Sequence, residues 1–210
     1  QTMAHLAKAL PGMHPDLAQT YGLFCHVGFP VMMQSLKGYS GTLVEANARI
    51  DRPFIATENA NHKTDHAVVG ALVSKVWRLS PVVTAAIRLH HDFEVMRHVD
   101  AADPEVTTLV AAGLLSEHLM RRHESLEPDA EWVNHGQSAL EWLQLSPSDV
   151  LTLEEEIHEA LNAAELGSLP ARFLIWSLHV PVHARRAGAR HHPHPGGLVG
   201  RSGQGRRPLR

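Results

Sequence analysis

The stretch DHAVVGALVSKVWRLSPVVTAAIRLHHD (residues 65–92) decides the fold class, because it carries two helical patterns and no alternation typical of strands. Its first half spaces five residues along one side of a helix: His66, Val69, Val73, Val76 and Leu79. We therefore expect a helix here that turns this side toward the core.

A second helix is predicted to begin in the middle of the same stretch. Ser80 is of a residue type that caps helices, and Pro81 follows at the position where helices tolerate proline best. Val83 and Ile87 then form an apolar stripe that runs toward the histidines at positions 90 and 91. The stretch is thus interpreted as a pair of helices that ends in histidines.

The same signals return twice further along the chain. DPEVTTLVAAGLLSEHLMRRH (103–123) and SPSDVLTLEEEIHEAL (146–161) both open on a capping residue followed by proline, and Asp149 is placed for a capping box. The residues expected to face the core are Val106, Leu109, Val110, Gly113 and Leu114 in the first segment and Val150, Leu153, Ile157 and Leu161 in the second. No strand of useful length is predicted. The expected fold class is all-α, a compact bundle of about six or seven helices.

The charge of the chain changes sharply near its end. Residues 1–166 hold 22 acidic residues and 11 Lys or Arg, a balance of −11, whereas residues 167–210 hold 8 Lys or Arg and no acid. From about Pro181 the apolar periodicity is lost, and Gly, Pro, Arg and His dominate. We predict a helical domain over residues 1–166 and a disordered basic tail over residues 167–210.

Composition argues against several classes of protein. Hydrophobic residues make up 44% of the chain, enough for a buried core, but no apolar run has the length of a bilayer span. The single cysteine, Cys25, cannot form an internal disulfide, which favours a cytoplasmic location. Because the sequence opens on Gln1 without a charged and apolar leader, we interpret it as a piece of a longer protein.

The segment FCHVGFP (24–30) places the cysteine beside a histidine and raises the question of a reactive pair. A catalytic thiolate needs a base that faces it. Adjacent helical residues point about 100° apart, so His26 is poorly placed to serve Cys25. We interpret Cys25 as a small buried residue and predict no catalytic residue here.

Histidines and aspartates in and after this segment have suitable chemistry for a divalent cation, since imidazole nitrogen and carboxylate oxygen both bind such ions. They are His26, Asp65, His66, His90, His91 and Asp92. Metal ions held there would activate water for attack on phosphorus. The other interpretation is a hydrogen-bonded core position for His66 and a helix end for His90 and His91.

Nucleic-acid binding is not expected of the helical domain, because phosphate contacts supply most non-specific affinity and the domain is acidic. Its basic cluster RRHE (121–124) falls on an expected helix end. The basic tail could contact nucleic acid or acidic lipid, and its His191, His192 and His194 could hold a metal. An extension without structure is the preferred interpretation of the tail.

Several segments, in this order, resemble the HDOD domain, an all-helical relative of the HD phosphohydrolases. GLFCHVGFP (22–30) occupies the place of a Gly-Leu-hydrophobic-His-Asp-x-Gly segment. DHAVVGALVSKVWRLS (65–80) is similar to a helix pair of the pattern Asp/Glu-His-x-x-x-Gly and Trp-x-Leu-Pro, and AAIRLHHD (85–92) to its Ala-Ile-x-x-His-His-Asp ending. EWLQLSPSDVLTLEEEIHEAL (141–161) is similar to the usual closing segment.

The resemblance covers about residues 1–165, is strongest over 21–92, and implies a function. HDOD domains are regarded as regulatory modules of bacterial signalling proteins and generally lack a complete set of metal ligands. Val27 stands where the metal-bridging Asp would be, so the resemblance implies no catalytic, cofactor-binding or metal-binding residue. It leaves as vestigial candidates His26, His66, His90, His91 and Asp92. The amino-terminal half of such a domain is expected to precede Gln1.

The leading hypothesis is a cytoplasmic, non-catalytic signal-transduction module that contacts a protein partner or an attached signalling domain and needs no cofactor. It would contact no membrane and, outside the 167–210 tail, no nucleic acid. The alternative is a metal-dependent phosphohydrolase of HD type with one divalent metal, surrounded by His26, His66, His90 and His91. A structural or nucleic-acid-associated protein that works through the basic tail is the third hypothesis.

Overall fold

The computed structural model describes residues 1–49, 51–98 and 100–167, and every regular element within them is helical. The all-α prediction is thus confirmed. The described residues form more helices than the six or seven expected, because three short helices lie between residues 28 and 62. No local pattern predicts an individual helix in that region.

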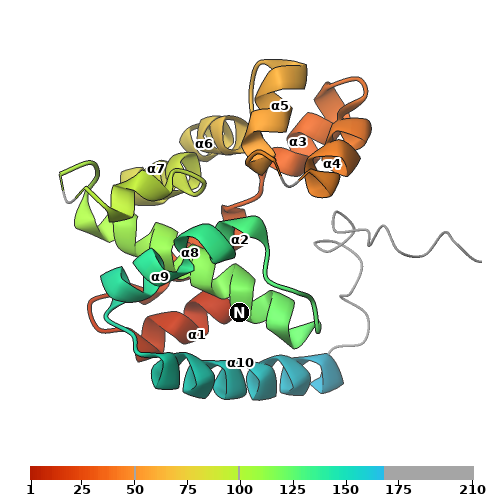
Figure 1. The fold of residues 1–210 in the computed structure, drawn as a ribbon. Coiled ribbons are helices and arrows are strands. Elements are labelled where there is room, and N and C mark those ends of the chain that lie inside the picture. Colours follow the sequence, from red (N-terminus) through yellow and green to blue (C-terminus); the bar gives the residue numbers. More distant parts are fainter. Residues whose placement is uncertain (50, 99, 168–210) are drawn as a thin grey trace, which may run out of the picture. The chain divides into compact units, whose positions relative to one another are not determined.

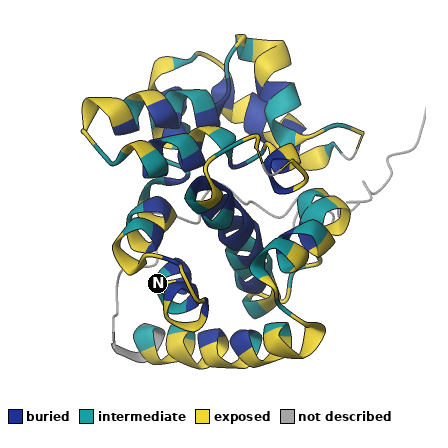
Figure 2. Cartoon of the chain, turned by 90° about the vertical axis from the view of Figure 1, so that its left-hand side faces the viewer, coloured by how far each residue is buried: buried dark blue, intermediate teal, exposed yellow. Residues whose placement is uncertain are grey.

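A long buried helix, α8 (Pro104–His123), is the centre of the fold. It lies among the surrounding helices and is buried along most of its length (Figure 2). The residues predicted to face the core are all buried: Val106, Leu109, Val110, Gly113 and Leu114. The apolar stripe read from this segment is therefore confirmed.

Five helices pack against α8 and enclose the main core (Figure 1). They are α1 (Thr2–Ala9), α2 (Pro15–Phe24), α7 (Pro81–Leu89), α9 (Ala130–Leu143) and α10 (Pro147–Gly167). The short 3-10 helix η1 (Phe93–Met96) contacts both α8 and α9. Val83 and Ile87 of α7 are fully buried, as the sequence predicts.

A smaller group of helices has an apolar centre of its own. It consists of α3 (Gly28–Ser35), α4 (Tyr39–Ala48) and α5 (Phe54–His62). Met32, Tyr39 and Leu43 are buried at its centre. Helix α6 (His66–Val76) joins the two groups, since it packs against both α3 and α7. The histidines singled out in the sequence lie at this junction.

Capping residues account for where two of the predicted helices begin. Ser80 accepts a hydrogen bond from the backbone N–H of Val83 (3.1 Å), and Pro81 follows as the first residue of α7. At α10 the backbone N–H of Ser146 donates to Asp149 Oδ2 (2.8 Å), and the N–H of Asp149 donates back to Ser146 Oγ (3.3 Å). These reciprocal bonds are the predicted capping box.

The inward side predicted for α6 is confirmed only in part: His66 is fully buried, and Val69 and Leu79 are partly buried against apolar clusters. Val76 is 77% exposed, and Val69 and Val73 are only half-buried. The buried residues of α6 are His66, Ala67, Gly70, Ala71 and Ser74. Apart from the histidine they are small, because α3 and α7 both pack closely on this helix. Close packing of helices thus overrides the apolar stripe of valines.

The predicted disordered basic tail lies outside the described residues from position 168 onward, and so do its His191, His192 and His194. The disorder of the tail stays a prediction. Within the part of the chain that the structure describes, no helix is long and apolar enough to cross a membrane.

Helix α3 approaches α6 so closely that glycine is required at its first residue. A Cβ atom on Gly28 would overlap the backbone carbonyl of His66. On α6 itself, a Cβ on Gly70 would lie 3.0 Å from Ile87 Cγ2, which is tight for a carbon contact. Glycines therefore let α3, α6 and α7 meet beside the histidines.

We expect Gly28→Ala to lower the free energy of unfolding by about 3 kcal/mol, the upper end of overpacking costs, because backbone atoms block the added methyl group. Gly41→Ala is the matched control, because Gly41 lies on the exposed side of α4 with open space around it. There alanine should stabilise the helix by about 0.5–1 kcal/mol. Denaturant unfolding of both variants measures the difference, and equal effects would contradict the close approach.

Candidate functional site

Four histidines from three parts of the chain gather where α2, α6 and α7 meet. His66 is the first residue of α6, His90 is the C-cap of α7, His91 follows it, and His26 lies between α2 and α3. The ring centroid of His66 lies 5.7 Å from that of His26, 5.0 Å from that of His90 and 4.9 Å from that of His91. The structure thus brings together the histidines of the sequence hypothesis.

A helix cap determines where His66 stands. The side chain of Asp65 accepts a hydrogen bond from the backbone N–H of Val68 (2.8 Å) and another from the side-chain amide of Asn59 (2.7 Å). This cap starts α6 at His66 and buries the carboxylate of Asp65. Asp65 is therefore used as a cap, with both of its oxygens occupied.

A carboxylate and an aromatic ring hold the fully buried His66 ring. Its Nδ1–H donates to Glu58 Oε2 (2.7 Å), and its backbone N–H donates to the same oxygen (3.3 Å). The hydroxyl of Tyr39 donates to the other oxygen of Glu58. Phe29 stacks on the imidazole, with centroids 3.9 Å apart and planes inclined by 16°. Since both oxygens of Glu58 accept, the hydrogen-bond network assigns the His66 proton to Nδ1.

His90 and His91 direct their Nε2 atoms at Nε2 of His66, over 3.1 Å and 3.0 Å. Nδ1–H of His90 donates to the carbonyl oxygen of Ile87 (2.7 Å). Nδ1 of His91 lies 2.7 Å from Glu131 Oε1 in the first turn of α9. Each ring is thus anchored by an oxygen at Nδ1 and faces the other rings with Nε2.

Burial changes the protonation of this cluster. It lowers the pKa of His66 and of His90 well below the ordinary value, and the charge of His91 lowers both further. Burial also opposes a charge on His91, but the carboxylates of Glu131, Glu117 and Glu58 together outweigh it and raise the pKa of His91. Burial raises the pKa of Glu58 against the hydrogen bonds that this residue accepts. His91 is therefore the ring of this trio that most readily carries a proton.

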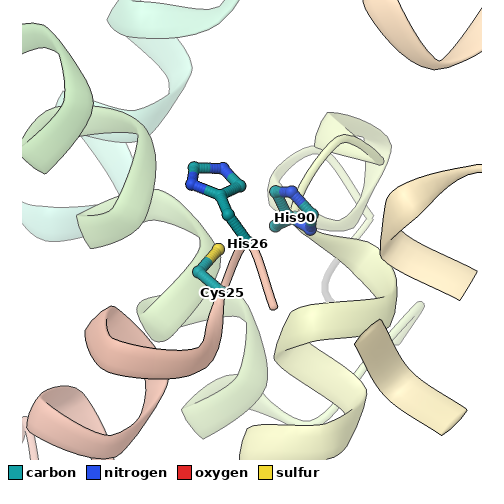
Figure 3. A group of neighbouring side chains, drawn as sticks. All are labelled: Cys25, His26 and His90. Atoms are coloured by element: carbon teal, nitrogen blue, oxygen red, sulfur yellow. The ribbon is translucent and has the colours of Figure 1, made fainter. Parts of the chain in front are cut away.

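Cys25 and His26 lie on the side of the cluster formed by the turn after α2. Figure 3 shows the two side chains next to each other, with His90 opposite, at the end of α7. A ligand atom of each of these three residues lies within 4.8 Å of the others. His26 Nε2 also lies 3.2 Å from Glu117 Oε1. Cys25 is buried, as predicted, and this burial, with the charge of Glu117, raises the pKa of its thiol.

The remaining sequence candidates do not face the Nε2 atoms. Asp92 is exposed at the start of η1, and Asp65 caps α6. Val27 has its Cγ1 3.6 Å from the place of a Cβ on Gly70, so it packs at the contact between helices. Among the described residues, the groups that can hold a metal ion contain no carboxylate: Cys25, His26 and His90, and His66, His90 and His91.

Sequence reasoning missed the carboxylates that anchor the histidines. Glu58 lies eight residues before His66 and is completely buried, which no pattern around it indicates. Glu131 lies 40 residues after His91, in a helix turn where an acidic residue is ordinary. Both contacts depend on how α5 and α9 pack, so the sequence offers no local signal for them.

We expect Glu131→Ala to lower the free energy of unfolding by about 1–3 kcal/mol, because the buried Nδ1–H of His91 loses its acceptor. Glu131→Gln keeps an acceptor oxygen and should therefore lower the free energy of unfolding by a smaller amount. Glu141→Ala changes an exposed residue on the same helix and should alter the free energy of unfolding by no more than about 0.5 kcal/mol. Denaturant unfolding measures all three, and equal losses for the two Glu131 variants would contradict the anchoring contact.

Comparison with known proteins supports part of the predicted resemblance. The model of the HDOD domain family matches residues 1–93. No family model matches the rest of the chain, including the segment 141–161 compared above with a closing segment. No curated protein and no solved structure matches the chain. Residues 1–93, which include His26, His66, His90 and His91, are therefore similar to the HDOD domain family.

Proposed function

We propose that this protein is a signalling output module that acts by contacting another protein and catalyses no reaction. The match to the HDOD family, which is generally linked to signalling output, supports the first part. A contrast within the structure supports action by contact without catalysis. The histidines that could bind a metal are mostly buried, whereas large apolar side chains are exposed on α6.

Burial of the histidines argues against a substrate site. His66 and His90 are 0% and 5% exposed, and the His91 side chain is 8% exposed. A phosphate ester would have to reach a metal between these rings for hydrolysis to occur. His26 is more open, with 41% of its side chain exposed, but its Nε2 is paired with Glu117. The cluster therefore suits a structural role better than turnover.

The exposed apolar residues of α6 form a surface that we call the α6 patch: Leu72, Val76 and the adjoining Trp77. They are 58%, 77% and 54% exposed, and Leu72 and Val76 are neighbours one helical turn apart. Exposed Lys75 and Arg78 flank the patch. An apolar surface with a basic rim fits a partner that offers apolar side chains bordered by acidic residues.

A second candidate function is metal-dependent phosphohydrolysis, which the convergence of three Nε2 atoms favours. The absence of carboxylates from the metal-capable groups of the described residues weighs against it, because paired metals that activate water commonly need bridging oxygens. Incubating the full chain with Mn²⁺ and a phosphodiester tests this candidate. We expect no turnover above that of a His66→Ala variant, and a clear excess would overturn the non-catalytic proposal.

We also propose a cytoplasmic location, which the lack of any partner for a disulfide within the chain supports. The same argument makes the partner or attached signalling domain a cytoplasmic protein. This location sets the conditions for the binding experiment, which uses cytoplasmic extract of the native host under reducing conditions.

The α6 patch predicts a matched pair of binding variants. Leu72→Ser with Val76→Ser should weaken partner binding at least tenfold, since each apolar side chain contributes about 1.5 kcal/mol or more when buried. Val133→Ser with Leu151→Ser removes equally exposed apolar residues from α9 and α10 and serves as the control. Proteins captured by each full-length variant are quantified by mass spectrometry.

The expected result is a protein retained by the wild type and by the control but lost from the α6 patch variant. Unchanged far-UV circular dichroism would show that the variants remain folded. If every captured protein is retained equally by both variants, the α6 patch is not the contact surface.

A further inference from the structure

We infer that a groove between α1 and α10 is a docking site for residues 173–178 of the same chain (FLIWSL), with Trp176 as the side chain that enters it. The segment lies outside the described residues. The groove shares no residue with the α6 patch, so the inference is independent of the proposed signalling function.

The first support is the groove itself. It lies where α10 packs next to α1 (Figure 1) and has a volume of about 260 Å³. Helix α10 lines it with Ala160, Leu161 and Ala164, and α1 contributes Ala4 and Lys8. Three of these five side chains are alanines, which leave room for large side chains from another segment. The groove therefore offers an apolar floor to a segment that carries bulky apolar residues.

The second support is that the later half of α10 has little packing. Leu153 and Ile157 are buried, but no described residue of α10 after Ile157 is. Leu161 is only partly buried against the main core. Most of the stability of a helix in a protein comes from packing of its apolar face, and α10 runs for 21 residues. A segment laid over Ala160 and Leu161 would supply that packing.

The third support is the composition of the segment. Five of its six residues are large and apolar: Phe173, Leu174, Ile175, Trp176 and Leu178. Apolar side chains are stabilised by removal from water, and six residues are too few to bury one another. The apolar periodicity of the chain is lost only from about Pro181, after this segment. Another surface is therefore needed to cover it.

The fourth support is the length of the link. Residues 168–172 (SLPAR) join α10 to the segment, and connections of about 2–8 residues are usual between helices that pack side by side. Pro170, at the centre of the link, cannot continue the helix. Ala164 and Trp176 are equally far from Pro170 in the sequence, so an antiparallel return sets them level. A short link also favours the groove of the same chain over that of a second copy.

The fifth support is charge. Helix α10 contains six acidic residues and no Lys or Arg, and no basic residue lies in its last turn. Arg172 directly precedes the segment, and residues 167–210 contain no acid. A return of the chain toward α10 would bring the guanidinium of Arg172 near an acidic helix and its negative dipole end. The segment therefore meets the groove without repulsion between like charges.

The test follows Trp176 in the full chain by fluorine NMR. Protein made with fluorotryptophan gives one signal for each of Trp77, Trp132, Trp142 and Trp176, and the variant Trp176→Phe assigns the last. The change of a signal between H₂O and D₂O reports how far water reaches that indole. We expect almost no change for Trp176 and a large one for Trp77, which is 54% exposed.

A matched pair of variants locates the segment. Ala160→Glu places a carboxylate in the groove and should raise the solvent effect on Trp176 to the level of Trp77. Asn162→Glu adds the same charge about 200° away around α10 and should leave Trp176 protected. Both positions are exposed, and glutamate is a good helix former, so both variants should fold. Far-UV circular dichroism checks this.

Three results would overturn the inference. The first is a Trp176 signal as sensitive to solvent as that of Trp77 in the wild type; protection that then develops on adding vesicles of anionic phospholipid would assign the segment to a membrane surface. The second is protection that disappears on dilution together with a dimer measured by light scattering, which would make a second copy the cover. The third is protection that survives Ala160→Glu; its loss in Leu72→Ser with Val76→Ser would place the segment on the α6 patch.

Discussion

The buried contact between Glu58 and His66 is the constraint on which the junction of the two helix groups depends. Removing a carboxylate and an imidazole from water costs several kcal/mol unless each finds hydrogen-bond partners. Here Glu58 accepts from the His66 ring, the His66 backbone and Tyr39. These bonds fix α5 against the start of α6. With α6 in place, the carbonyl of His66 can meet α3 only where that helix begins with Gly28.

Much of the fold can be predicted from local sequence signals, but the buried side of α6 cannot. Ser80 and the Ser146–Asp149 pair cap helices as their residue types predict, because capping involves only neighbours in the chain. The stripe predicted for α6 is correct at His66, which is fully buried, but wrong at Val76, which is exposed. Close packing against α3 and α7 favours small residues on the buried side of α6. No local sequence pattern indicates which helices pack there.

The histidines of the site could be named from the sequence, but their chemistry could not. The segment FCHVGFP indicates a missing carboxylate at Val27, and the structure places its Cys25 and His26 beside His90 of the cluster. Carboxylates are present after all, but they come from Glu58 and Glu131 and accept hydrogen bonds at Nδ1 of His66 and His91. They orient imidazoles instead of binding an ion, and only the packing of α5 and α9 brings them there.

Helix α6 connects the two features on which function is argued. It begins at His66 in the cluster and ends at Val76 beside Trp77, so its 11 residues span about 16 Å. A rigid element of this length moves both ends together. An ion held by His66 would influence a partner at Trp77 only if the partner distinguishes two placements of α6, because a ligand shifts an equilibrium by no more than its differential affinity. The same reasoning makes the effect reciprocal: a partner that selects one placement of α6 would change the affinity of the cluster for such an ion by the same factor.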